Sequence, residues 1–175
     1  LRQRKIASSQ KFLREFPNHP KTAQIIDAVI EDQLSLGQLQ NAINTSRQLL
    51  ALDRKMPKAL EKKAWVTIAN AQFDLKSYEQ AEKTYQQVLN YDWSADKRRR
   101  FRRQRATALY KRAENLERRG RRPQAATLFV SVEDTLPGSE IAAKALYDAA
   151  TLHLKSERWR SAIALLDEFQ KAYPQ

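Results

Sequence analysis

The chain has 175 residues, 42% of them hydrophobic, which is enough for a sizeable core. Cysteine is absent, which excludes thiolate catalysis and disulfides, and three glycines with six prolines leave little room for a fold of strands and turns. The formal net charge is +12, and no apolar run approaches the roughly 20 residues that span a bilayer.

The predicted elements are nine helices, placed from hydrophobic periodicity and from the prolines and glycines that interrupt it. A leading helix covers residues 2–16 and ends before Pro17, because proline is not tolerated inside a helix. Gly37 ends the second helix, as a glycine just past a helix terminus does. Ser94 and Ser139 are expected N-caps of later helices. The four predicted hairpins cover residues 21–53, 58–91, 94–136 and 139–173.

The stretch 61–93 carries the clearest pattern. Apolar and small residues recur at three- and four-residue steps on both sides of a break at Lys76 and Ser77, which predicts two amphipathic helices joined as a hairpin. Trp65 and the later Trp159 are both expected to pack inside hairpin cores. The patterned residues of this stretch are Trp65, Ile68, Ala69, Tyr78, Ala81, Tyr85 and Val88.

The same template recurs along the chain. Phe129 and Val132 follow Ala125 at the steps at which Tyr85 and Val88 follow Ala81. The equivalent alanines, Ala42, Ala81, Ala125 and Ala162, are 39, 44 and 37 residues apart. We expect the long helix that begins near Ser94 to account for the largest of these spacings.

This pattern resembles the tetratricopeptide repeat, in which a Trp, a Leu and a small residue in one helix are followed by an Ala, an aromatic and an apolar residue in the next. The resemblance implies an all-α, right-handed solenoid of helical hairpins, a single domain over residues 1–175, and binding of a protein or peptide partner. The spacings exceed the family's repeat of about 34 residues. Gln72 stands where the family has a tyrosine, and Trp93 stands where it has a proline.

A narrower resemblance concerns two helix ends, at residues 12–17 and 169–174. Both are similar to helix ends of bacterial cell-envelope repeat proteins of the outer-membrane assembly lipoprotein and Tol–Pal coordinator types. This resemblance implies a periplasmic or envelope-associated location, with a cytoplasmic one left open. Because the chain begins at Leu1 without a methionine, we expect it to be part of a longer protein.

In the family, the first helices of successive hairpins line a groove that binds peptides. Asn70 and Lys111 match two positions of the family's carboxylate clamp, whereas Val66 replaces a clamp lysine, so we do not expect a clamp here. The resemblance places in the groove Lys63, Val66, Asn70, Phe73, Tyr110, Lys111, Glu114, Lys144, Tyr147 and Thr151.

The positive charge is concentrated in one segment. From Ser94 to Arg122 there are thirteen Lys or Arg against three Asp or Glu, a net +10, so the rest of the chain contributes only +2. Guanidinium groups on one helix face can bind carboxylates or phosphates with two hydrogen bonds each. The alternative is a solvated face without a binding role, whose arginines pair with neighbouring acidic residues. The candidate contacts are Arg98, Arg99, Arg102, Arg103 and Arg105.

Three partners fit such a helix. The preferred one is an acidic protein segment or acidic envelope polymer. The alternative is nucleic acid held through its phosphates by residues 97–122. However, Phe101 is the only aromatic residue in the basic run 97–105, and no RNA-binding signature is present. A membrane surface is the third option, but this helix lacks a broad apolar opposite face.

Catalysis has little support in the sequence. His19 lies in an Asn-His-Pro turn and His153 on an apolar helix face, so we interpret both as structural or solvated. No His or carboxylate spacing is typical of a metal site, and no glycine-rich phosphate loop is present. We therefore predict a non-enzymatic binding scaffold without cofactor or metal, whose oligomeric state the sequence leaves open.

Overall fold

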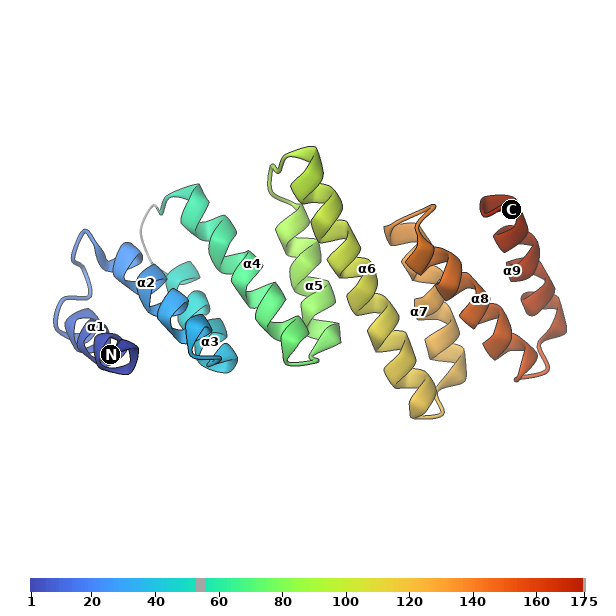
Figure 1. Cartoon of the computed structure of the whole chain (residues 1–175), viewed down its shortest axis with the longest axis horizontal. Coiled ribbons are helices and arrows are strands. Elements are labelled where there is room, and N and C mark those ends of the chain that lie inside the picture. Colours follow the sequence, from blue (N-terminus) through green and yellow to red (C-terminus); the bar gives the residue numbers. More distant parts are fainter. Residues whose placement is uncertain (53–55, 175) are drawn as a thin grey trace. The chain divides into compact units, whose positions relative to one another are not determined.

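The computed structural model describes residues 1–52 and 56–174, and the predicted helix end at Asp53 lies outside these residues. Within them the chain forms nine α-helices and no strand (Figure 1), which confirms the all-α prediction. The helices are α1 (Arg2–Glu15), α2 (Thr22–Ser35), α3 (Leu39–Leu50), α4 (Lys58–Asp74), α5 (Tyr78–Leu89), α6 (Ala95–Arg118), α7 (Arg122–Thr135), α8 (Glu140–Leu154) and α9 (Trp159–Ala172).

The helices form two compact units, Leu1–Tyr91 with α1 to α5 and Asp92–Gln175 with α6 to α9. In each unit every helix packs on its neighbours in sequence. In addition, α2 contacts α4 in the first unit, and α6 contacts α8 in the second. Successive helices within a unit run in alternating directions (Figure 1). Each unit is therefore built as a solenoid is, from hairpins that contact only the adjacent hairpins.

All four hairpin turns share one backbone conformation. Each has a residue in the left-handed region, namely Gly37 (φ 67°), Lys76 (φ 60°), Gly120 (φ 74°) and Glu157 (φ 56°). These residues lie five positions before Ala42, Ala81, Ala125 and Ala162, so the turns repeat with the same spacing as the alanines. The N–H of the following residue donates to a carbonyl five residues earlier at 2.9 Å in each turn, the closure of a Schellman motif: Gln38 to Gln33, Ser77 to Gln72, Arg121 to Leu116 and Arg158 to His153.

The repeated alanines mark the closest helix contacts. Ala42, Ala81, Ala125 and Ala162 are each 0% exposed. Large side chains one helical turn further along fill the space beside two of them, since Tyr85 and Phe129 are almost fully buried. The small residues thus let the helices approach, and the aromatic rings complete the core.

The helix ends that precede proline are also alike. Phe16, Leu136 and Tyr173 each end a helix with φ between −130° and −145° and ψ between 62° and 70°, and each donates its N–H to the carbonyl four residues before it. A proline follows each of them. Since α7 and α9 are the second helices of their hairpins, α1 has the features of a second helix as well.

The structure corrects two local predictions. Ser139 caps α8, because its hydroxyl accepts a hydrogen bond from the N–H of Ala142, but Ser94 occupies the N-cap position of α6 without any side-chain cap bond. Trp65 packs beside the buried Ile43 and Ile68 as predicted, whereas Trp159 is 58% exposed. Trp159 lies two residues after the left-handed Glu157, at the tip of a hairpin, where few neighbours can cover a large ring.

Candidate partner-binding surfaces

The first turns of α6 expose a cluster of arginines. We define the basic ridge as Arg99, Arg100, Arg102 and Arg103, all of which are exposed. Within the part of the chain that the structure describes, none of their guanidinium groups makes an ion pair or hydrogen bond. The ridge therefore offers its donors to a ligand without first breaking internal contacts.

The position of the ridge follows from the length of α6, which has 24 residues against 14 in α7 and 15 in α8. The buried α6 residues that share a core with α7 and α8 begin at Ala106, and none precedes it. Arg99 and Arg103 lie seven residues, two helical turns, before Ala106 and Tyr110, so they continue the same face of the helix. This face of α6 carries apolar residues where α7 and α8 cover it. It carries arginines where α6 extends beyond that core.

A second line of arginines on α6 is less exposed than the basic ridge. Arg98, Arg105 and Arg112 are half-buried, and each makes at least one polar or ring interaction of its own. Beside them Phe101 is 6% exposed and meets Trp93 edge-on, with ring centroids 4.8 Å apart. The Lys97 ammonium lies 5.8 Å from the Trp93 ring centroid. Because these arginines are half-buried and have interactions of their own, we separate them from the ridge, although the sequence grouped Arg98 and Arg105 with the ridge arginines.

Among the predicted groove residues of the first unit, Lys63 is already neutralised. Its ammonium lies 2.8 Å from Asp27 and 2.6 Å from Glu31, both on α2. Burial alone would lower the pKa of Lys63, but the hydrogen bonds and charges of the two carboxylates outweigh it and raise the pKa above 10.5. Lys63 thus joins α4 to α2, and its charge is balanced before any ligand arrives.

Asn70 is tied to the core of its own hairpin. The Tyr85 hydroxyl donates a hydrogen bond of 2.8 Å to the Asn70 carbonyl oxygen, and the Tyr85 ring is buried. The side-chain oxygen of Asn70 is therefore committed to internal structure. Its neighbours Val66 and Phe73 on α4 are half-buried.

In the second unit, Tyr110 is a core residue. It is 5% exposed, its ring lies 5.1 Å from that of Phe129, and its hydroxyl donates to Asp148 on α8. Burial, followed by the hydrogen bond and charge of Asp148, raises the pKa of the Tyr110 hydroxyl well above 10. The Lys144 ammonium lies 5.0 Å from the ring centroid. Because the Tyr110 side chain is buried, we leave this residue out of the proposed contact surface.

Two other predicted groove residues of this unit remain near solvent. The Lys111 ammonium pairs with Glu114 at 2.8 Å, one helical turn further along α6. Tyr147 on α8 is 56% exposed, and its ring centroid lies 6.4 Å from that of Phe169. An exposed aromatic ring with a partly buried aromatic neighbour is suited to apolar contact with a ligand.

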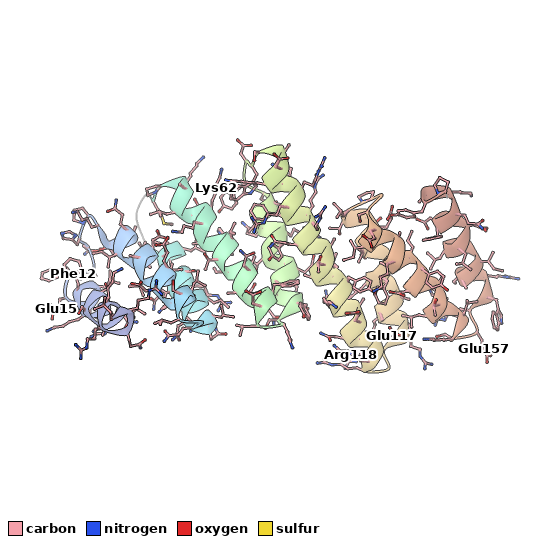
Figure 2. All side chains as sticks on the ribbon, in the orientation of Figure 1. Phe12, Glu15, Lys62, Glu117, Arg118 and Glu157 are labelled. Atoms are coloured by element: carbon pink, nitrogen blue, oxygen red, sulfur yellow. The ribbon has the colours of Figure 1, made fainter. Side chains whose placement is uncertain are left out.

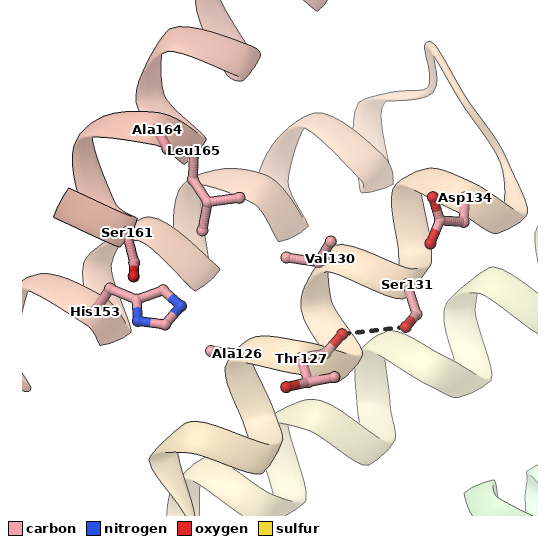
Figure 3. Close-up of a pocket in the computed structure, with 9 residues that line it drawn as sticks. All are labelled: Ala126, Thr127, Val130, Ser131, Asp134, His153, Ser161, Ala164 and Leu165. Atoms are coloured by element: carbon pink, nitrogen blue, oxygen red, sulfur yellow. Dashed lines mark hydrogen bonds between the residues drawn. The ribbon is translucent and has the colours of Figure 1, made fainter. Parts of the chain in front are cut away.

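Sequence reasoning missed a hollow of about 540 Å³ in the second unit, between α7, α8 and α9 (Figure 3). Val130 and Leu165 face each other across it, and His153 and Ser161 lie together at one end, with Asp134 at the other. It could not be found beforehand, because its lining comes from three helices whose contact depends on tertiary packing. The lining residues are Ala126, Thr127, Val130, Ser131, Asp134, His153, Ser161, Ala164 and Leu165.

The described residues offer neither a metal site nor a membrane-spanning helix. No group of three or more His, Cys, Asp or Glu side chains within residues 1–52 and 56–174 is arranged to hold a metal ion. In those same ranges, no helix combines the length and apolar character needed to cross a membrane.

Fold and surfaces together define an α-helical hairpin repeat protein with an exposed basic ridge. The family model of the tetratricopeptide repeat matches residues 63–92 and 144–175, which cover most of α4, all of α5, most of α8 and all of α9. The chain therefore contains tetratricopeptide repeats at these two places. A search among curated protein sequences gives no match.

Several solved structures of repeat proteins are similar to this chain. MamA is 15% identical with a TM-score of 0.44, over 95% of this chain and 85% of MamA. YrrB, a TPR protein with an unusual peptide-binding site, is 16% identical with a TM-score of 0.38, over 95% and 94% of the two chains. The TPR2AB domain of yeast Sti1, in complex with pHSP90, is 17% identical with a TM-score of 0.42, over 99% and 78%.

Proposed function

We propose that this chain is a non-enzymatic scaffold whose basic ridge binds an acidic segment of a protein partner. The observation that carries the proposal is the state of Arg99, Arg100, Arg102 and Arg103, which are exposed and without internal ion pairs in the described chain. Each guanidinium can bind a carboxylate by donating two parallel hydrogen bonds in one plane. A partner with several carboxylates would also relieve the repulsion between these closely spaced charges.

The helical register gives the ridge a defined shape. Arg102 and Arg103 lie three and four residues after Arg99, so all three side chains leave the same side of α6. The edge-on contact between the buried Phe101 ring and Trp93 supports the helix beneath them. A rigid helix presents the charges at fixed spacing, and this reduces the ordering cost of binding.

Tyr147 is the groove residue that we retain as a second contact, because its ring is 56% exposed. Its role would be to hold an apolar side chain of the partner. The charges of Lys63 and Lys111 are already paired with acids, so we assign these two lysines no leading role in capturing a partner.

The test is titration of the chain with an acidic polypeptide, poly-glutamate, and with a single-stranded oligonucleotide over a range of salt concentrations. The triple variant R99E/R102E/R103E should bind poly-glutamate about tenfold more weakly or worse, since exposed charge pairs contribute roughly 0.2–1 kcal/mol each. The matched control is R4E/R14E/R47E, which changes the net charge equally at exposed residues of the first unit. Equal loss in both variants would remove the ridge from the mechanism.

The oligonucleotide arm decides between the two classes of partner. Tighter binding of the oligonucleotide than of poly-glutamate, with a steep salt dependence that R99E/R102E/R103E reduces, would favour the nucleic-acid alternative through residues 97–122. We prefer the protein partner because the ridge has no exposed aromatic ring within it to stack on bases.

We further propose that this protein is periplasmic or associated with the cell envelope. This rests on the resemblance of residues 12–17 and 169–174 to helix ends of envelope repeat proteins. Fractionation of cells that produce the full-length protein tests it, and recovery only in the cytoplasmic fraction would contradict it.

A further inference from the structure

We propose that one edge of the second unit, formed by two hairpin tips, docks on an anionic phospholipid surface. The tips are the α6–α7 turn and the α8–α9 turn, which lie at the same end of this unit (Figure 1). We define the tip edge as residues 117–122 and 155–160. It is distinct from the basic ridge, which occupies the opposite end of α6.

The tip edge is strongly basic. Its twelve residues contain seven Lys or Arg and two Glu, a net +5. Figure 2 labels Glu117, Arg118 and Glu157 at this end of the helices. The exposed basic side chains are Arg118, Arg119, Arg121, Arg122, Lys155, Arg158 and Arg160.

Few of these charges are compensated from within. The Lys155 ammonium lies 3.8 Å from the Glu117 carboxylate, a contact that also joins the two tips, and the Arg118 guanidinium donates to Asn115. Within the described chain the side chains of Arg119, Arg121, Arg122, Arg158 and Arg160 make no ion pair or hydrogen bond.

The repeat geometry aligns the two tips. Gly120 and Glu157 have the same left-handed conformation, and Arg121 and Arg158, which follow them, have nearly equal backbone angles (φ −85°, ψ 56° and φ −91°, ψ 63°). Equivalent residues of stacked hairpins point the same way. Neighbouring helices pack about 8–10 Å apart, so the arginines form a row rather than a single point charge.

An apolar anchor lies in the same edge. Trp159 is 58% exposed and directly follows Arg158, Leu154 is 38% exposed before the turn, and Ile163, one helical turn beyond Trp159, is 58% exposed. Tryptophan is favoured at the boundary between headgroups and acyl chains, where its ring is partly apolar and its N–H stays hydrated. A cluster of four to eight Lys or Arg beside such a residue is the combination that binds anionic leaflets.

These features favour a lipid surface over nucleic acid as the occupant. The charges are carried on projecting tips, whereas a nucleic-acid strand is usually held in a groove that follows its backbone. The single exposed ring of the tips has the aliphatic Leu154 and Ile163 beside it instead of further aromatics, so it suits insertion better than stacking of successive bases.

The test is co-sedimentation of the chain with vesicles of phosphatidylcholine alone and of phosphatidylcholine mixed with phosphatidylglycerol. We expect binding only to the mixed vesicles, weakening as salt screens the charges. The variant R119E/R121E/R122E should lower the partition coefficient of the chain at least about a hundredfold. The reason is that each basic residue near an anionic surface contributes about 1 kcal/mol of attraction. The control R4E/R14E/R47E, with the same net charge, should lose much less. Circular dichroism would verify that both variants remain helical.

The apolar anchor has its own pair of variants. W159A should weaken binding to the mixed vesicles by about tenfold or more, whereas Y147A, which removes a similarly exposed ring elsewhere in the unit, should change it little. Equal losses in R119E/R121E/R122E and R4E/R14E/R47E, or equal effects of W159A and Y147A, would overturn the proposal. So would binding of an oligonucleotide through Arg119, Arg121 and Arg122 without any binding of anionic vesicles.

Discussion

The four left-handed turn residues provide a matched pair of substitutions in each unit. In the second unit, Gly120 and Glu157 occupy the same position of successive hairpins, at φ 74° and φ 56°. Glycine adopts this conformation without steric cost, whereas a side chain is strained in it. We predict that Glu157→Gly stabilises the unit and that Gly120→Ala destabilises it.

The magnitude follows from two opposing terms. A non-glycine residue in the left-handed region costs roughly 1–2 kcal/mol, and the Glu157 side chain makes no ion pair or hydrogen bond in the described chain that its removal would break. Glycine also makes the unfolded chain more flexible, which reduces the stabilisation by Glu157→Gly by about 0.4–1 kcal/mol. The net stabilisation is about 0.5–1 kcal/mol. A Cβ at Gly120 would meet no atom within 4 Å, so the cost of Gly120→Ala is that of the backbone alone and is of similar size.

Thermal unfolding followed by circular dichroism measures both effects. A change of 1 kcal/mol shifts Tm by roughly 4–8 °C in a unit of this size, so we expect Glu157→Gly to raise Tm by about 2–8 °C and Gly120→Ala to lower it by a similar amount. Lys76→Gly and Gly37→Ala repeat the comparison in the first unit. A lower Tm for Glu157→Gly, or no effect of Gly120→Ala, would refute the assignment of strain to these turns.

Three further predictions concern the cores and one tyrosine. Phe129→Ala should lower the free energy of unfolding by about 3–5 kcal/mol, because the ring is 0% exposed, and a loss below about 1 kcal/mol in urea unfolding would contradict its packing. Ala125→Leu should cost about 1–3 kcal/mol by overpacking, while the exposed Ala164→Leu should be nearly neutral by the same assay. Burial and the 2.6 Å hydrogen bond to Glu61 raise the pKa of Tyr91 to about 12, so its contribution to stability is complete below pH 10 and is lost as the pH rises toward 12. Between pH 10 and pH 12 the urea midpoint should therefore fall less steeply with pH for Tyr91→Phe than for the parent. Equal slopes for the two proteins would show that the Tyr91–Glu61 hydrogen bond does not cause the loss of stability.

Most of the fold follows from local patterns in the sequence. The regular recurrence of Ala81 and its counterparts predicted the repeated hairpins, and in the structure each of these alanines is fully buried. Gly37 predicted its turn, and the break in the apolar pattern predicted the one at Lys76. The left-handed conformation of Lys76 and Glu157 could not be predicted, since neither side chain favours it.

The surfaces were harder to predict, because exposure depends on which helices cover each face. Tyr110 was expected in a groove, yet Asp148 and Phe129 enclose it. Trp159 was expected in a core, yet it projects from a hairpin tip. The run of arginines on α6 was evident in the sequence, but its division into a half-buried line and an exposed ridge depends on where the contact with α7 and α8 begins. The binding roles of the ridge residues stay predictions.

The most direct test of the scaffold proposal is the affinity of the chain for poly-glutamate, measured by isothermal titration calorimetry for the parent, R99E/R102E/R103E and R4E/R14E/R47E. We predict that the ridge variant binds about tenfold more weakly or worse than the equally charged control. Indistinguishable affinities for the two variants would contradict the claim that Arg99, Arg102 and Arg103 form the binding surface.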